Sequence, residues 1–144
     1  ETARALVLVG RSTYLFRARG NEAVAAETQR GMLATASSRA ELTASGVDPW
    51  RLLRALERAR RAWPVPVRCL QTAITFRRML LAHGLDGQLR VGVRKAGADG
   101  PVEGHAWIEI ADIVFDPDRL SQGFLPMEAS AEHPPYLDSR ESAS

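Results

Sequence analysis

The chain has a single cysteine, Cys69, which stands where an extended proline-containing segment gives way to a helical pattern. Pro66 lacks a backbone N–H and has a fixed φ, so a helix can hardly begin before Val67. The first turn of a helix leaves backbone N–H groups free and forms the positive end of the helix dipole, and Arg68 adds a cation there. This environment favours a reactive thiolate, whereas a structural cysteine would serve only as a small apolar side chain.

One histidine and two aspartates stand on two later segments whose hydrophobicity alternates with a period of two. A tight turn at Ala111-Asp112 would place His105 opposite Asp118 and diagonal to Asp116, so either carboxylate could reach the imidazole. We favour Asp116, because it still lies on the predicted strand. Pro117 would end that strand and leave Asp118 in an exposed turn.

A cysteine at a helix start, a histidine on a strand and an aspartate on the next strand form the set that a thiol hydrolase needs. The thiolate attacks a carbonyl, the imidazole takes and returns the proton, and the carboxylate fixes the imidazole tautomer. The N–H of Cys69 would stabilise the oxyanion, and the indole of Trp63 is a second candidate donor, although an aromatic at a helix end is more often packed. His83 and His133 fit a helix end and a tail, so the chain lacks the ligands of a usual zinc site.

The elements that must position these residues are predicted as helices first and strands afterwards. This order favours an α+β fold in which N-terminal helices pack on a small antiparallel sheet. Asp48-Pro49 predicts a helix N-cap and first helical residue, and Gly84 predicts the end of the cysteine helix. The predicted helices cover residues 3–19 (with a strand as the alternative), 22–32, 49–63 and 67–83, and the predicted strands cover residues 88–94, 103–110 and 113–116.

Length and composition indicate one globular domain of 144 residues with an ordinary net charge of +2. We divide it into an N-terminal helical segment, residues 1–46, a catalytic core, residues 47–120, and an irregular C-terminal tail, residues 121–144. The arginines of the 49–63 helix are expected to form a solvated face rather than a nucleic-acid site. No apolar run is long enough for a membrane span, and one cysteine cannot form an internal disulfide, so we expect a cytoplasmic protein.

Three segments taken together resemble a known family: Cys69-Leu70 opening a helix, Leu89-Arg90-Val91-Gly92-Val93-Arg94-Lys95, and His105-Ala106-Trp107-Ile108-Glu109. They are similar to the transglutaminase-like cysteine peptidases of lasso-peptide biosynthesis, which remove the leader from a ribosomally made precursor peptide. The resemblance covers roughly residues 50–120.

This resemblance implies a papain- or transglutaminase-like fold with Cys69 as nucleophile, His105 as general base and Asp116 as orienting acid. Phe115-Asp116-Pro117 matches the family's carboxylate at the end of the strand that follows the histidine strand. The hairpin turn departs from the family, because it lacks the Asp-Gly common in relatives and is a residue shorter. That departure keeps Asp118 as an alternative.

The family further implies peptide hydrolysis without a metal or an organic cofactor. The residues before the core leave little room for a leader-recognition domain, so we expect a separate recognition protein of winged-helix type as a partner. An ATP-dependent lasso cyclase is expected to act on the released peptide. Two other interpretations remain: a transglutaminase or amidase on the same scaffold, and a catalytically silent binding module that uses the arginine-rich helix.

Overall fold

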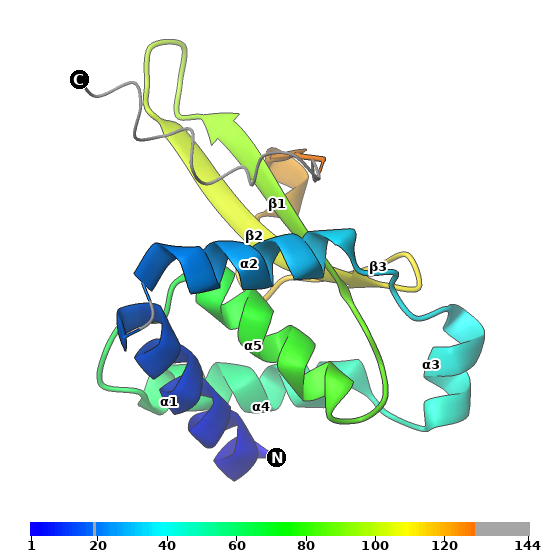
Figure 1. Cartoon of the computed structure of the whole chain (residues 1–144). Helices are drawn as coiled ribbons and strands as arrows, with labels where there is room; N and C mark the ends of the chain where they lie inside the picture. Colours follow the sequence, from blue (N-terminus) through cyan, green and yellow to red (C-terminus); the bar gives the residue numbers. More distant parts are fainter. Residues whose placement is uncertain (19, 129–144) are drawn as a thin grey trace.

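The structure is a computed structural model that describes residues 1–18 and 20–128. Within these residues the chain forms five α-helices and a four-stranded antiparallel sheet of order β3-β2-β1-β4 (Figure 1). The predicted α+β class is therefore confirmed. The elements are α1 (Thr2–Ala18), α2 (Gly20–Leu33), α3 (Arg39–Ser45), α4 (Pro49–Ala62), α5 (Cys69–Leu81), β1 (Gln88–Lys95), β2 (Val102–Ile110), β3 (Ile113–Phe115), the 3-10 turn η1 (Ser121–Gly123) and β4 (Leu125–Pro126).

Helix α4 begins where its capping residues predict, and α5 begins two residues after the start of the predicted 67–83 helix. The Asp48 side chain caps α4 by accepting a hydrogen bond from the Trp50 N–H at 2.9 Å, and Pro49 is the first helical residue. Helix α5 begins at Cys69 itself, and Gly84 follows its end with a φ of 76°. Residues 3–18 are helical, so the alternative of a strand there is wrong.

The β2–β3 hairpin has the register that a two-residue turn predicts. Ile110 pairs with Ile113 and Ile108 pairs with Phe115. The two turn residues, Ala111 and Asp112, have φ values of 50° and 63°, as a two-residue turn that follows the twist of the strands requires. Strand β3 ends at Phe115, so Asp116 is the first residue beyond it.

One hydrophobic core joins the helices to one face of the sheet. Figure 1 shows α1, α4 and α5 gathered beneath the sheet, while β1 and β2 form a long hairpin above them. Ala106, Ile108 and Ile110 of β2 point into this core. Ala5 and Val9 of α1 belong to the same cluster, so the N-terminal helices and the sheet are packed around a common interior.

The other face of β2 carries His105 and Trp107, which are buried by a segment that follows β3. After η1 the chain places Phe124 against this face and then pairs β4 with β1. Gly92, which lies opposite His105, is needed for this packing because a Cβ there would come within 2.8 Å of both Phe124 and the Trp107 ring.

Three short elements were not anticipated from the sequence. Residues 39–45 form α3 instead of a polar connection, and residues 121–126 contain η1 and β4. The part of the predicted irregular tail at residues 129–144, with His133, lies outside the described residues. None of the described helices combines the length and apolar composition that crossing a membrane requires.

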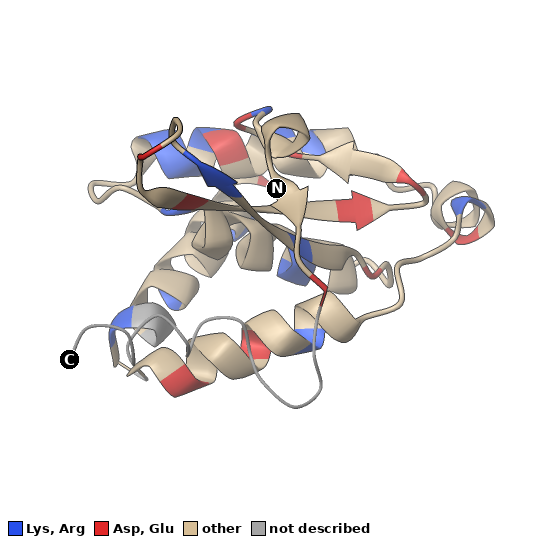
Figure 2. Ribbon diagram, turned by 90° about the horizontal axis from the view of Figure 1, so that it is seen from above, with Lys and Arg blue, Asp and Glu red and all other residues tan. Residues whose placement is uncertain are grey.

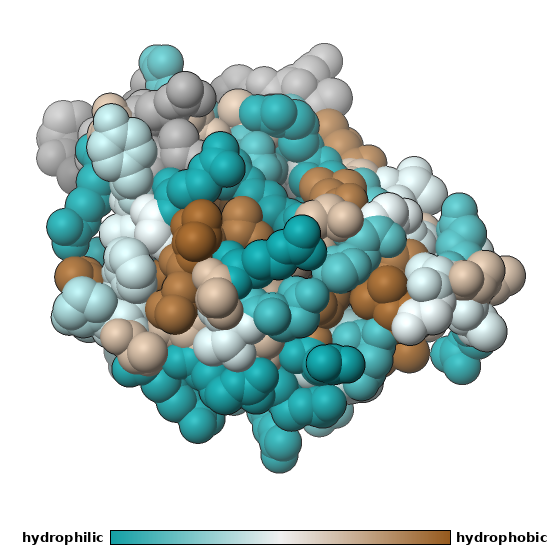
Figure 3. Space-filling model, turned by 90° about the horizontal axis from the view of Figure 1, so that it is seen from below, coloured by the Kyte–Doolittle hydropathy of each residue, from teal (hydrophilic) through white to brown (hydrophobic). Residues whose placement is uncertain are grey.

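Charged residues are spread over the helices and strands (Figure 2), and several of them form ion pairs. Three arginines of α4 have polar partners: Arg54 pairs with Asp48, Arg58 with the Thr2 hydroxyl and Arg60 with Asp118. Seen from below, much of the surface is hydrophilic, with smaller apolar groups between (Figure 3). Internal pairing of this kind fits the expectation of a solvated arginine-rich face.

Candidate active site

Cys69 is the first residue of α5 and is half-buried. The preceding residue, Arg68, occupies the N-cap position without a capping side chain, and its carbonyl accepts hydrogen bonds from the Thr72 N–H at 2.9 Å and the Thr72 hydroxyl at 3.0 Å. No described residue accepts a hydrogen bond from the N–H of Cys69. The helix therefore presents a free backbone donor at the same residue as the thiol.

His105 and Asp116 form a buried pair on the hairpin. The imidazole Nε2 lies 3.0 Å from Oδ1 and 2.9 Å from Oδ2 of Asp116, and the two side chains are 4% and 3% exposed. With its proton on Nε2, the ring donates to the carboxylate and leaves Nδ1 as the basic nitrogen. The predicted contact between His105 and Asp116 is thus present.

The Asp116 carboxylate is held by the turn that follows it. Oδ1 accepts from the Asp118 N–H at 3.1 Å, and Oδ2 accepts from the N–H groups of Leu120 and Ser121 at 2.8 and 2.9 Å. Arg119 reaches this geometry with a φ of 54°. Because three backbone N–H groups donate to this carboxylate, it is fixed in position as a hydrogen-bond acceptor.

Asp118 has a different environment. Its Oδ1 pairs with the Arg60 guanidinium at 3.0 Å, and its side chain is 34% exposed. One potential ligand atom from each of His105, Asp116 and Asp118 lies within 4.8 Å of the others. However, His105 and Asp116 are already bonded to each other and Asp118 to Arg60. This set fits proton handling by the buried pair better than metal ligation.

Aromatic rings fix the plane of the His105 imidazole. The Trp107 ring lies 6.0 Å away at an interplanar angle of 26°, and the Phe124 ring lies 5.3 Å away at 37°. The Arg94 guanidinium covers the outer side of Phe124, with its carbon 4.4 Å from the ring centroid. Sequence reasoning missed Phe124, because the segment around it shows no periodicity that would mark it as buried.

Cys69 lies in the wall of a pocket that adjoins the His105–Asp116 pair. Ala106 and Trp107 of β2 and Pro117 and Asp118 of the turn after β3 also line it. Leu53, Thr72, Ala73, Phe76 and Phe115 complete the lining. His105 and Asp116 are not lining residues themselves, but their chain neighbours are. No hydrogen bond joins Cys69 to His105 in the described part of the chain; such bonds are often long before a substrate binds.

The Trp63 side chain packs on α1 and does not line the Cys69 pocket. A Cβ at Gly10 of α1 would lie 3.0 Å from Cη2 of Trp63, so the indole ring packs directly on the glycine. Trp63 is not among the residues that line the Cys69 pocket. The close approach of α1 to this ring helps to fix the segment that leads into α5.

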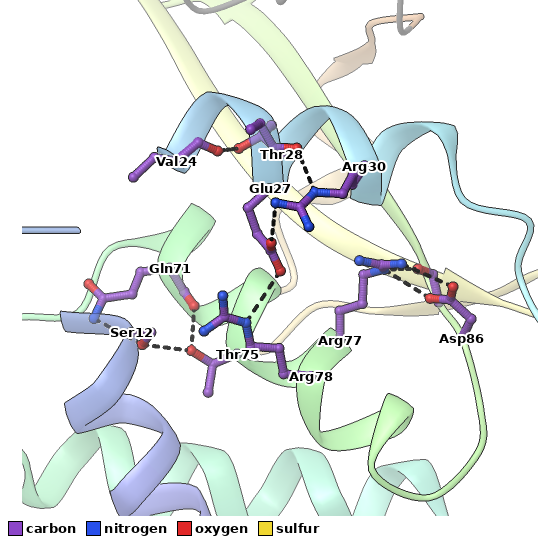
Figure 4. A network of polar contacts seen from close by, with 12 residues as sticks. Ser12, Val24, Glu27, Thr28, Arg30, Gln71, Thr75, Arg77, Arg78 and Asp86 are labelled. Carbon is purple, nitrogen blue, oxygen red and sulfur yellow. Dashed lines mark hydrogen bonds and ion pairs between the residues drawn. The ribbon is translucent and has the colours of Figure 1, made fainter. Parts of the chain in front are cut away.

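A polar network anchors α5 behind Cys69 (Figure 4). The Thr75 hydroxyl lies within hydrogen-bond distance of the Gln71 backbone carbonyl oxygen, at 2.7 Å, and of the Ser12 hydroxyl of α1, at 2.9 Å, and all three residues are buried. At the other end of α5, Arg77 makes two contacts with Asp86, at 2.9 and 3.0 Å. Satisfied buried polar groups rigidify their surroundings, so this network holds the helix start in one place.

Comparison with known families gives one match. A family model described as "Transglutaminase-like superfamily" matches residues 6–129, which include the helices as well as the sheet. No match was found among curated proteins or solved structures.

Proposed function

The chain belongs to the transglutaminase-like superfamily, and on that basis we propose that it is a cysteine peptidase that removes the leader from a ribosomally made lasso-peptide precursor. The superfamily includes cysteine-dependent hydrolases and acyltransferases. The observation that carries the proposal is the buried His105–Asp116 contact beside a pocket lined by Cys69. The finer assignment to leader removal is supported by the likeness of Cys69-Leu70, Leu89–Lys95 and His105–Glu109 to leader peptidases.

In the proposed reaction Cys69 is the nucleophile, His105 the general base and Asp116 the orienting acid. Nδ1 of His105 takes the thiol proton as sulfur attacks the carbonyl of the last leader residue. The same nitrogen then protonates the departing amine as the C–N bond breaks, which leaves the leader as a thioester on Cys69. Water attacks the thioester, His105 accepts its proton, and the thiol is restored as the leader acid departs.

The oxyanion that forms in both steps needs preorganised donors. The free N–H of Cys69 is one of them, because it belongs to the same residue as the attacking sulfur. We assign no oxyanion role to Trp63, whose ring packs on Gly10. Asp116 acts through His105, whose neutral form it holds with the proton on Nε2.

The proposed partners follow from the same likeness. A separate leader-recognition protein of winged-helix type would deliver the precursor to Cys69, and an ATP-dependent lasso cyclase would act on the released peptide. The reaction belongs in the cytoplasm, where a ribosomally made precursor is first available. Delivery would raise the rate chiefly by increasing the local concentration of the scissile bond.

The proposal is tested with a lasso-peptide precursor and a leader-recognition protein of winged-helix type, the two partners that the likeness implies. The purified chain is incubated with the precursor, with and without the recognition protein, and the products are identified by mass spectrometry. We expect cleavage at one peptide bond, faster with the recognition protein and lost in His105→Ala. His83→Ala is the matched control, because His83 lies at the end of α5 with only a long contact to Glu1 at 3.8 Å.

Hydroxylamine in a parallel reaction distinguishes hydrolysis from acyl transfer to an amine. A leader ending in a free acid, even with hydroxylamine present, supports the peptidase. A hydroxamate as the main product at low hydroxylamine concentration would indicate a transferase. Full-rate cleavage by His105→Ala would contradict the proposed chemistry, and full-rate cleavage by the isolated chain would contradict the delivery partner.

A further inference from the structure

The outer edge of β2 is unpaired beside the candidate site. Strand β1 pairs with β2 along its whole length, from Val102 to Glu109. Strand β3 pairs with β2 only at residues 108–110 and then ends. Residues 102–107 of β2 therefore have a neighbouring strand on one side only within the described chain. In Figure 1 the long part of β2 continues past the short β3.

The hairpin register determines which backbone groups face this open edge. In a two-residue hairpin the pair that flanks the turn, Ile110 and Ile113, exchanges both backbone hydrogen bonds. Every second residue of β2 then directs its N–H and C=O toward the β3 side. Beyond the end of β3 these residues are Ala106 and Gly104, whereas His105 and Trp107 direct theirs toward β1.

No described residue provides a backbone partner for Ala106 or Gly104 on this side. The residue that would lie opposite Ala106 is Pro117, which has no N–H to donate. Ala106 is nevertheless 4% exposed and lines the same pocket as Cys69 and Pro117. Buried backbone groups without partners are rare in proteins, so this position is suited to a ligand that supplies them.

We propose that an extended segment of the peptide substrate binds at this edge as an additional strand, with its backbone hydrogen-bonded to Ala106 and Gly104. This inference rests on the proposed function and names how that site recognises its substrate. Backbone pairing orients the chain, and alternate side chains point to opposite faces of the sheet. One of them meets the apolar wall formed by Phe76, Phe115 and Ala73, and the bond to be cleaved passes Cys69.

Gly104 suits this role because it leaves the edge accessible. A Cβ at Gly104 would meet only the Gly92 carbonyl oxygen, at 3.9 Å. An alanine at this position is therefore compatible with the fold and keeps the backbone N–H. A proline would remove the N–H that faces the open edge, where proline is tolerated because no strand bond is lost.

The first test alters the substrate and leaves the protein unchanged. The best-cleaved decapeptide of a mixed-sequence library is resynthesised with one N-methyl group at each position in turn, and kcat/KM is measured. Because the methyl group removes one hydrogen bond and also obstructs the edge, we expect kcat/KM to fall about tenfold or more at alternate positions. At the positions between these, kcat/KM should fall only slightly, so that large and small losses alternate along the peptide. Losses without this period would overturn strand addition.

The second test observes the edge directly and needs no turnover. Amide hydrogen exchange of the Cys69→Ala chain is measured by NMR with and without the same decapeptide. Exchange at Gly104 and Ala106 should slow about tenfold or more when the peptide binds, while the Lys95 amide, near the opposite edge of the sheet, should not change. Unchanged exchange at Gly104 and Ala106 under saturating peptide would refute the proposal.

A pair of protein variants completes the design. Gly104→Pro should raise KM about tenfold relative to Gly104→Ala, which keeps the backbone N–H; equal KM values in the two variants would refute the role of the Gly104 N–H. If Gly104→Pro does not fold, as shown by its circular dichroism, the N-methyl series still decides. If the chain cleaves no library peptide, the exchange experiment with the best-binding decapeptide still tests the edge, and cleavage of the precursor with the recognition protein tests the proposed function separately.

Discussion

Replacing Asp116 by asparagine is the most informative single change at the candidate site. The carboxylate accepts from His105 Nε2 and from three backbone N–H groups, those of Asp118, Leu120 and Ser121. An amide NH₂ cannot accept a hydrogen bond. At the Oδ2 position it would face two of the backbone donors, so asparagine should place the NH₂ at Oδ1 and leave the Asp118 N–H unpaired.

Two measurable consequences follow from Asp116→Asn. The loss of this part-buried hydrogen bond should cost about 0.5–1.5 kcal/mol of unfolding free energy, measured by urea denaturation. The loss of the anion should reduce turnover much more, because the imidazolium formed during attack is no longer stabilised and the wrong imidazole tautomer becomes available. The loss should approach about 10⁴ in kcat, by analogy with the aspartate of serine proteases.

Asp118→Asn is the matched control. Asp118 pairs with Arg60 at the surface, and such a pair contributes at most about 1 kcal/mol, so we expect near-native stability and a small loss of turnover. A greater loss of turnover in Asp118→Asn than in Asp116→Asn would refute the assignment of the orienting acid.

Three further predictions concern packing and capping. Trp63→Phe should keep near-normal turnover, measured on the precursor peptide, because the ring packs on Gly10; a loss of 10²-fold or more would instead indicate an oxyanion donor. Gly92→Ala should lower the unfolding free energy by about 1–3 kcal/mol in urea, because its Cβ would overlap Phe124 and Trp107, and native stability would contradict that contact. The backbone N–H of Ser38 donates to the Glu41 carboxylate and lowers the pKa of Glu41. The ionised carboxylate therefore stabilises α3 at pH values above the ordinary pKa of a glutamate, and this stabilisation is lost as the pH falls through the lowered pKa of Glu41. Amide exchange in α3 should accelerate in that acid range, and Glu41→Ala should remove this dependence.

The parts of the site that depend on local sequence were predictable. Asp48-Pro49 and the residues before Cys69 determine where two helices begin, since capping and the missing proline N–H act over a few positions. The turn at Ala111-Asp112 determines the register that brings Asp116 to His105. The capping box of α3, with Ser38 and Glu41 three residues apart, was equally readable but was overlooked.

The parts that depend on long-range packing were not predictable. Phe124 covers His105 only because the chain turns at Arg119 and crosses to the far edge of the sheet, where β4 pairs with β1. Strand β4 has only two residues, which are too few to show an alternating pattern in the sequence. Likewise Trp63 is close to Cys69 in the sequence, but its ring packs on Gly10 of α1, where the helix has no side chain. This contact joins residues far apart in the sequence, so no local pattern predicts it.

The central claim, that Cys69 forms a thioester with the leader, is tested most directly by intact-mass spectrometry of the chain quenched during turnover of the precursor. We expect an adduct with the mass of the leader less one water, located on Cys69 by peptide mapping. The adduct and the cleavage should both be absent in Cys69→Ala. Cleavage by Cys69→Ala at the native rate, with no adduct on the native chain, would contradict the account.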